Sequence, residues 1–287
     1  MATILFDGIA YGMLLFVLAV GLAVTMGLMN FINLAHGAFA MAGGYITVLL
    51  MQRLDVPFLV CLPLSFAGAA LLGAVMERTL YRPLYRKAHL DQVLFSIGLV
   101  FMAVSAVDYY VGSTQQIMQL PEWLKGRTEI GSLGMGHYRL FIIAVCAALT
   151  VALQLILTRT RFGSRLRAAV DDQRVAAGLG INVNVVFLST FAFGSGLAGL
   201  GGALGAEVLG MDPTFPLKFM IYFLIVVAVG GTASITGPLL AALLLGIADV
   251  AGKYYIPKLG GFIVYTLMIV ILLWKPSGLF VRQGGKA

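Results

Sequence analysis

Long apolar segments joined by short polar ones constrain the fold of this chain more than any other feature. A transmembrane helix needs roughly 20 consecutive apolar residues, and five of the segments approach or exceed this length. Several shorter segments cannot cross a bilayer alone. The nine apolar segments are residues 4–26, 38–52, 57–76, 93–111, 140–157, 185–208, 219–229, 239–251 and 262–274.

The composition is typical of a membrane protein. Of the 287 residues, 60% are hydrophobic and only 11% are charged, and the mean hydropathy is +0.98. Cys61 and Cys146 lie within apolar segments, which favours packing over a disulfide or a metal site. We predict an all-α integral membrane protein, a polytopic helical bundle of about 8–10 transmembrane segments with short or broken helices. Residues 1–287 are expected to form a single transmembrane domain.

The basic residues predict an orientation. The net charge of +7 does not indicate nucleic-acid binding, because Lys and Arg lie in short loops between apolar segments. Such loops mark the cytoplasmic side, so residues 77–90, 158–184 and 275–287 are expected inside and residues 112–139 outside. Three apolar segments precede residue 77, which places the N-terminus outside. The outer segment contains three expected interface residues, Pro121, Trp123 and Tyr138.

Residues 27–44, GLMNFINLAHGAFAMAGG, interrupt the apolar pattern with two asparagines, a histidine and four glycines. Such residues at membrane depth are tolerated where they are buried in protein or line a cavity. We interpret the stretch as a flexible break that shapes a translocation path and its gate, at mid-membrane or at the inner mouth. An ordinary loop at the bilayer surface is the alternative. Its candidate residues are Asn30, Asn33, His36, Gly37, Gly43 and Gly44, with Asn33 and His36 expected to bond to backbone rather than to substrate.

A second break separates the short apolar segments 219–229 and 239–251. The intervening glycines favour two half-length or tilted helices that meet there, with Gly230 and Gly231 as further candidate gate residues. Each break follows one helix and precedes two more, which suggests an internal repeat. The alternative is that glycine-rich breaks between helices simply look alike.

Small residues recur every four positions in the segment 185–208. This spacing lets helix backbones approach closely in lipid, within the chain or against a partner subunit. Glu207, near the end of the segment, either faces a vestibule or reaches the outer surface. The small residues expected at the contact are Gly194, Ala198, Gly202 and Ala206.

The inner loop 158–184 combines an arginine-rich approach with a short amphipathic helix predicted over residues 164–177. Gly178 and Gly180 are its stop signals. Two interpretations remain open: a membrane-surface helix without a partner, or a lever that docks on a soluble subunit.

Four motifs resemble the branched-chain amino acid ABC permease family. They are NFINLAHGAF, RLRAAVDDQRVAAGLGIN, VGGTASITGPLLAALLLG and KPSGLF, and they follow the family's order over essentially the whole chain. The chain is most similar to the first of the two paired permease subunits, because it lacks the longer N-terminal extension common in the other.

The resemblance implies an importer in the bacterial cytoplasmic membrane. Its expected partners are a second permease subunit, two ATP-binding subunits, an extracytoplasmic solute-binding protein and membrane lipid. It implies branched-chain amino acids as substrates, with urea, short amides and aromatic acids as alternatives among relatives. Asn33, His36 and Gly37 match the family signature. The positions that match the family's coupling loop to the ATPases are Arg167, Ala168, Asp171, Ala176, Gly180 and Ile181.

The sequence favours transport over catalysis. The chain contains no G-x-x-x-x-G-K-[ST] loop, so we expect ATP to be bound by a partner subunit and no cofactor or metal in this chain. An intramembrane hydrolase would need a nucleophile and a base, for which only Ser195 with His36 could be considered. A passive channel is the closer rival, and the loop at residues 164–181 distinguishes it from an ATP-coupled permease.

Overall fold

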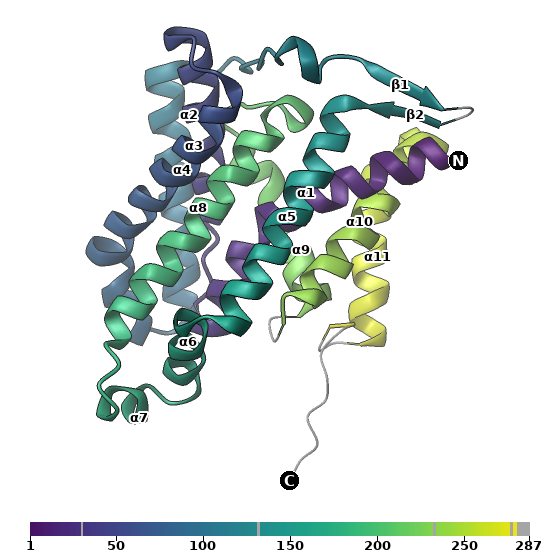
Figure 1. Ribbon diagram of the computed structural model, residues 1–287. Helices are drawn as coiled ribbons and strands as arrows, with labels where there is room; N and C mark the ends of the chain where they lie inside the picture. The colour runs from purple at the N-terminus through teal and green to yellow at the C-terminus, as the bar shows by residue number, and fades with distance from the viewer. Residues whose placement is uncertain (30, 131–132, 232–233, 276–277, 280–287) are drawn as a thin grey trace.

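The computed structural model describes residues 1–29, 31–130, 133–231, 234–275 and 278–279, and its ribbon is shown in Figure 1. Helices form in every predicted apolar segment and usually extend a few residues beyond it, because polar residues at the ends continue the backbone hydrogen bonds. The helices are α1 (Ala2–Met29), α2 (His36–Leu54), α3 (Phe58–Met76), α4 (His89–Val111), α5 (His137–Arg159), α6 (Arg161–Asp171), α7 (Gln173–Gly178), α8 (Val183–Leu209), α9 (Phe215–Gly230), α10 (Thr236–Tyr255) and α11 (Gly260–Trp274).

The predicted fold class is confirmed. Seven helical spans in the described residues are long and apolar enough to cross a membrane, and α9 is a shorter apolar helix of 16 residues. Of the two alternatives, half-length or tilted helices, the half-length one is wrong for α10, which has 20 residues. Its polar C-terminal residues Lys253, Tyr254 and Tyr255 continue the helix beyond the apolar run from which its length was predicted.

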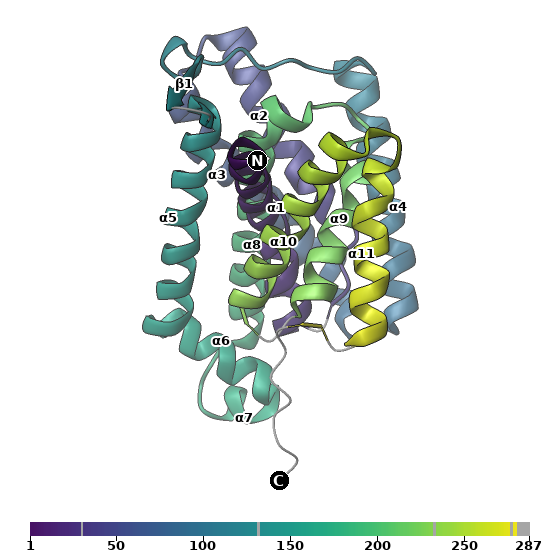
Figure 2. The same ribbon diagram turned by 90° about the vertical axis from the view of Figure 1, so that its right-hand side faces the viewer.

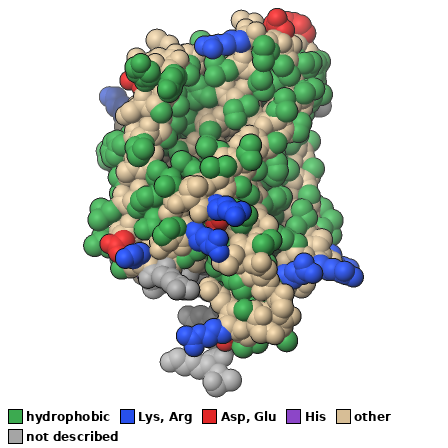
Figure 3. Space-filling model, turned by 90° about the vertical axis from the view of Figure 1, so that its left-hand side faces the viewer, with side chains coloured by type: hydrophobic (Ala, Val, Ile, Leu, Met, Phe, Trp, Pro, Cys, Tyr) green, Lys and Arg blue, Asp and Glu red, His purple; other side chains and the backbone are tan. Residues whose placement is uncertain are grey.

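The two ends of the bundle differ. Figures 1 and 2 show α6 and α7 at one end and the strands β1 (Arg127–Ile130) and β2 (Leu133–Gly136) at the other. The N-terminus lies toward the strands, where the Gly134 amide donates to Thr3 Oγ1 at 3.3 Å. In Figure 3 apolar side chains cover most of the face shown, and most of its Lys and Arg side chains lie in the lower half. By the positive-inside rule, the end with α6 and α7 is the inner end.

The antiparallel hairpin of β1 and β2 was not predicted, because its residues show no clear alternation of apolar and polar side chains. Arg127 pairs with Gly136, and the hairpin leads directly into α5. Trp123, before the hairpin, is exposed as expected of an interface residue. The same expectation is wrong for Tyr138, which is only 5% exposed and donates a hydrogen bond to the Leu204 carbonyl at 2.7 Å. Its hydroxyl finds a backbone acceptor on α8, so the ring is buried.

Helix α8 runs through the core and packs against α1, α2 and α3. Its glycines permit these contacts, because a Cβ atom on Gly202 would lie 1.8 Å from the Ala40 carbonyl oxygen of α2. On the facing helix, a Cβ atom on Gly43 would lie 2.1 Å from the Gly199 carbonyl oxygen. No side chain fits at either position without moving backbone, so the small residues set the distance between α2 and α8.

The peripheral helices α4 and α11 expose apolar side chains that a soluble protein would bury. Such faces are stable in lipid, because hydrocarbon tails are as apolar as the side chains themselves. The large exposed apolar residues of these two helices include Leu90, Leu94, Phe101, Met102, Phe262, Ile269, Val270 and Leu273.

Candidate translocation and coupling sites

The first break, residues 31–35 between α1 and α2, is held by its own asparagine. Asn33 is 1% exposed, and its Oδ1 atom accepts hydrogen bonds from the Ala35 amide at 3.1 Å and from the Tyr81 hydroxyl at 3.0 Å. The bond from the Ala35 amide replaces a helical backbone hydrogen bond. The bond from Tyr81 fixes the turn to the helical segment that continues α3. Asn30 lies outside the described residues.

Helix α4 supplies hydrogen-bond acceptors to the same break. The Leu34 amide donates to Ser96 Oγ at 3.2 Å, and the Ile32 amide donates to Gln92 Oε1 at 3.4 Å. Backbone groups without helical partners are thus satisfied inside protein, as the interior of a membrane requires. Gln92 and Ser96 were not singled out from the sequence, since a polar residue at the start of a span usually faces water.

His36 begins α2 and joins three helices. Its Nε2 atom lies 2.9 Å from the Leu18 carbonyl oxygen of α1, and because a carbonyl oxygen only accepts, Nε2 is the donor. The ring is 2% exposed and meets Phe223 of α9 edge-on at 6.3 Å. His36 therefore bonds to backbone and packs against an aromatic ring, and its position depends on α1 and α9 together.

The glycines of the first break face neighbouring helices. A Cβ atom on Gly37 would lie 3.0 Å from Pro216 Cα of α9, and one on Gly44 would lie 2.1 Å from Met211 Cε. With Gly43 against α8, these three positions let α2 lie between α8 and α9. In this structure they serve close packing of the helices around the break.

The small residues of α8 lie on its buried side. Gly194 faces Gly21 of α1, with 3.1 Å between its ideal Cβ position and the Gly21 carbonyl oxygen. Ala198 is fully buried and Ala206 is 1% exposed. Gly194 thus lies in the contact of α8 with α1, and Gly202 lies in the contact of α8 with α2, within this chain.

The second break, between α9 and α10, is closed by local bonds. Gly231 has φ +80°, a conformation that favours glycine, and a Cβ atom on Gly230 would lie 2.5 Å from the Pro238 backbone. Ser234 Oγ contacts Thr236 Oγ1 at 3.2 Å and accepts from the Gly237 amide at 3.3 Å. Thr232 and Ala233 lie outside the described residues.

The inner segment forms two helices where the sequence predicted one. Asp172 has an extended backbone, φ −153°, and its Oδ1 atom accepts from the amides of Arg174 at 2.8 Å and Val175 at 3.0 Å. It therefore caps the N-terminus of α7 and separates α7 from α6. The predicted single helix over residues 164–177 is wrong, because Asp172 takes the N-cap conformation and interrupts it. The stop signals are confirmed, since α7 ends at Gly178 and Gly180 has φ +82°.

The predicted coupling residues divide into exposed and buried positions. Arg167 and Asp171 are exposed on α6, whereas Ala176 of α7 is 1% exposed. The Ile181 amide donates to the Ala176 carbonyl at 3.0 Å, which folds the chain back after α7. Ala168 is half-buried and its carbonyl accepts from the Asp172 amide at 3.2 Å, and Gly180 is exposed at the turn.

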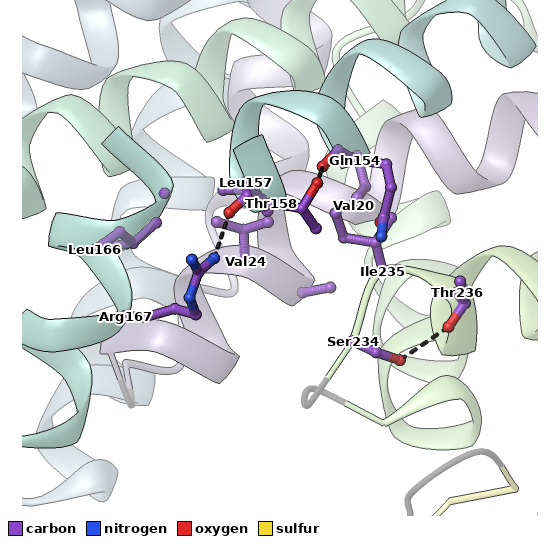
Figure 4. A pocket seen from close by; sticks show the side chains of 12 residues that line it. Val20, Val24, Gln154, Leu157, Thr158, Leu166, Arg167, Ser234, Ile235 and Thr236 are labelled. Carbon is purple, nitrogen blue, oxygen red and sulfur yellow. Dashed lines mark hydrogen bonds between the residues drawn. The ribbon is translucent and has the colours of Figure 1, made fainter. Parts of the chain in front are cut away.

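A cavity of about 280 Å³ connects α6 with the second break (Figure 4). Its walls come from α1, the end of α5, α6 and residues 234–236. The Arg167 guanidinium donates to the Leu157 carbonyl near the end of α5, across one side of this cavity. The structure thus brings together the coupling segment and the second break, which lie more than 60 residues apart in sequence.

The residues considered for a hydrolase do not form a pair. Ser195 lies against Gly73 of α3, whereas the His36 ring is directed at Leu18 of α1. In the described residues no group of three or more His, Cys, Asp or Glu could hold a metal ion. Serine and histidine need direct contact to act as nucleophile and base, and here they belong to different helix contacts.

A multi-pass helical membrane protein with two backbone breaks and a basic helical segment at its inner end is the class that these observations define. Residues 4–272 match the family model for the permease component of branched-chain amino acid transport systems, and the chain belongs to this family.

Comparison with characterised sequences agrees with this assignment. The chain is 27% identical to the high-affinity branched-chain amino acid transport permease LivH of Escherichia coli K12, over 97% of this chain and 94% of LivH. It is 29% identical to BraD of Pseudomonas aeruginosa, over 97% and 95% of the two chains. The LivM permease of E. coli is 26% identical, over 93% of this chain and 68% of LivM. No solved structure matches the chain.

Proposed function

We propose that this protein forms the translocation path of an ABC importer for branched-chain amino acids, which an extracytoplasmic binding protein delivers. The family and the names of LivH and BraD support the transport class and the substrate. Residues 1–287 act as one transmembrane permease domain in the bacterial cytoplasmic membrane.

The importer that we propose contains further subunits. A second permease subunit completes the path, and two ATP-binding subunits supply the energy. The similarity to LivH and BraD supports a role as the first of two paired permeases. ATP is hydrolysed outside this chain, because the glycine-rich stretch at residues 230–237 lacks the lysine that nucleotide-binding loops require.

The observation that carries the proposal is the contact of α6 with both the end of α5 and the cavity beside the second break. Exposed Arg167 and Asp171 face the inner side, where an ATPase subunit docks in our proposal. Closure of the ATPases displaces α6, and the displacement reaches residues 234–236 through the shared cavity walls. The bundle then shifts between two packed states, and at the gate formed by the two glycine-rich breaks the second break is the part that moves.

The coupling assignment is tested in the complete importer, reconstituted in liposomes. Arg167→Ala and Asp171→Ala are expected to abolish the stimulation of ATPase activity by the loaded binding protein, while the subunits still assemble. Arg165→Ala is the matched control, because Arg165 is an exposed arginine on the same helix. Unchanged stimulation in the first two variants would remove the coupling assignment.

The same liposomes test the substrate. We expect ATP-dependent uptake of leucine, isoleucine and valine in the presence of the binding protein. Uptake of urea, short amides or aromatic acids instead would reassign the substrate. Uptake that continues without ATP and runs only down the gradient would identify a passive channel.

A further inference from the structure

An ion-paired cavity lies in the outer half of the bundle, away from both breaks and from α6. It has a volume of about 390 Å³ and lies between α1, α5, α8, α9 and α10. Its polar wall consists of Asp7, Tyr11, Arg139, Asp249 and Lys253. Ionisable groups at membrane depth are costly, and they mark substrate or ion pathways.

Asp249 is the most deeply buried charged group of this cavity. It is 1% exposed on α10, and its Oδ2 atom accepts from Lys253 Nζ at 2.5 Å. The other oxygen, Oδ1, is buried and accepts no hydrogen bond of normal geometry among the described residues, and the Tyr222 hydroxyl of α9 interacts with the same carboxylate. A buried carboxylate oxygen without a donor is unfavourable, so this atom is an open acceptor for a cationic donor.

The surroundings of Asp249 suit an ammonium group. Lys253 Nζ lies 5.6 Å from the centre of the Tyr11 ring, within the range of a cation–π interaction. The lysine side chain is 56% exposed, so its ammonium reaches Asp249 from the solvent side of the cavity. The carboxylate and the aromatic ring together stabilise a primary ammonium ion, and Lys253 shows the position that such a group takes.

A second ion pair lines the same cavity. Arg139 of α5 pairs with Asp7 of α1, and the arginine side chain is 45% exposed. Both residues also line an adjoining cavity of about 520 Å³ below the hairpin, together with Glu207. Glu207 is exposed and faces this vestibule. The two cavities share Asp7, Arg139 and Val208, so the cavity that contains Asp249 communicates with the outer surface.

The remaining wall is apolar. It includes Leu14 of α1, Ile142 of α5 and Phe219 of α9. A ligand complementary to the whole cavity carries an ammonium group, a carboxylate and an apolar body, and has no net charge, because two acids and two bases balance in the walls. A free α-amino acid with an apolar side chain has these properties.

We infer that this cavity binds a free apolar α-amino acid as a zwitterion, on its way from the binding protein to the inner path. The ligand ammonium donates to Asp249 Oδ1, and the ligand carboxylate accepts from Arg139, whose fork of donors matches a carboxylate. No bond is made or broken other than hydrogen bonds and ion pairs. The inference deepens the proposed function, on which its place in a transport cycle rests.

Direct binding tests the site without the binding protein. Radiolabelled L-leucine is titrated against the purified complex of permease and ATPase subunits in nanodiscs. Two analogues are added as test competitors: leucinamide, which lacks the carboxylate, and 4-methylpentanoate, which lacks the ammonium group. We expect saturable leucine binding that neither probe displaces at equal concentration. Asp249→Asn is expected to weaken leucine binding at least about tenfold, since a charged hydrogen bond is lost.

Asp212→Asn is the matched control, because Asp212 is also paired with a lysine, Lys218, at the outer end but does not line the cavity. Its leucine affinity is expected to equal that of the unmodified complex. If Asp249→Asn does not assemble, Arg139→Gln replaces it with the same expected loss. Absence of saturable binding in the unmodified complex, or equal affinity in all variants, would overturn the inference.

The two proposals fail separately. If the unmodified complex takes up leucine and its Asp249→Asn variant binds leucine normally, the cavity site is ruled out and the importer function remains. Leucine binding that depends on Asp249, in an importer that takes up a different solute, would remove the proposed substrate and retain a zwitterion site.

Discussion

The two breaks of the bundle follow the same pattern of helix, break and helix, but they are held in different ways. The first is buried and cross-linked to other elements, through Asn33 to Tyr81 and through its amides to Gln92 and Ser96. The described bonds of the second are mainly local, and Ser234 is exposed beside the inner cavity.

This difference separates two mechanical roles. A break that depends on long-range bonds and close glycine contacts holds α1, α2 and α4 in fixed relation. A break with local bonds, next to α6, can change conformation at lower cost, because few bonds to other elements must be broken. We therefore expect the first break to be the fixed element and the second to be the moving one.

The largest expected effect comes from filling the contact behind the first break. Gly43→Ala places a methyl group against the Gly199 backbone, and we expect it to lower the free energy of unfolding by about 3 kcal/mol or more, or to prevent folding. Thermal unfolding of the purified protein in detergent measures the change. Gly98→Ala, in α4 with nothing within 4 Å, is the control and is expected to be neutral or slightly stabilising. Equal stability of the two variants would contradict the fixed first break.

A smaller loss is expected when one polar side chain of the break is removed. Asn33→Ala loses two buried hydrogen bonds and leaves the Tyr81 hydroxyl without its acceptor, which costs about 1–3 kcal/mol. Ser234→Ala, in the second break, is expected to change stability by less than about 0.5 kcal/mol. The comparison uses the same unfolding measurement, and Tyr81→Phe with Asn33→Ala forms a double-mutant cycle. Independent effects of Asn33→Ala and Tyr81→Phe would show that the bond between them carries no energy.

A small change in stability, with a larger change in transport, is expected at Gly231. Gly231→Ala strains a backbone with φ +80° by about 1 kcal/mol. If the second break moves, the strain alters the free energies of its two states unequally. Initial uptake rates in liposomes then change by a larger factor than the small change in stability accounts for, and the melting temperature measures that stability. Gly261→Ala has no close neighbours and serves as the control. If uptake falls only as far as the loss of folded protein explains, the second break is a structural turn and does not move.

The sequence alone determined the membrane class, the positions of the apolar helices and the expected inner loops. Hydropathy reports the length of a span, and basic loops report its orientation, because both depend on local composition. The C-terminal end of α7 was also predictable, since Gly178 and Gly180 favour a stop wherever the helix lies.

Only the tertiary structure decided which side of each helix is buried and which polar groups meet. Lipid is as apolar as a protein core, so a span such as α4 carries no strong sequence signal for the face that turns inward. Residues far apart in the chain are joined by the pairing of Asp7 with Arg139, by the bond from Tyr138 to α8 and by the cavity that Arg167 shares with residues 234–236. Such contacts depend on how closely the helices pack, and the glycines of α8 set that distance only once a specific partner faces them.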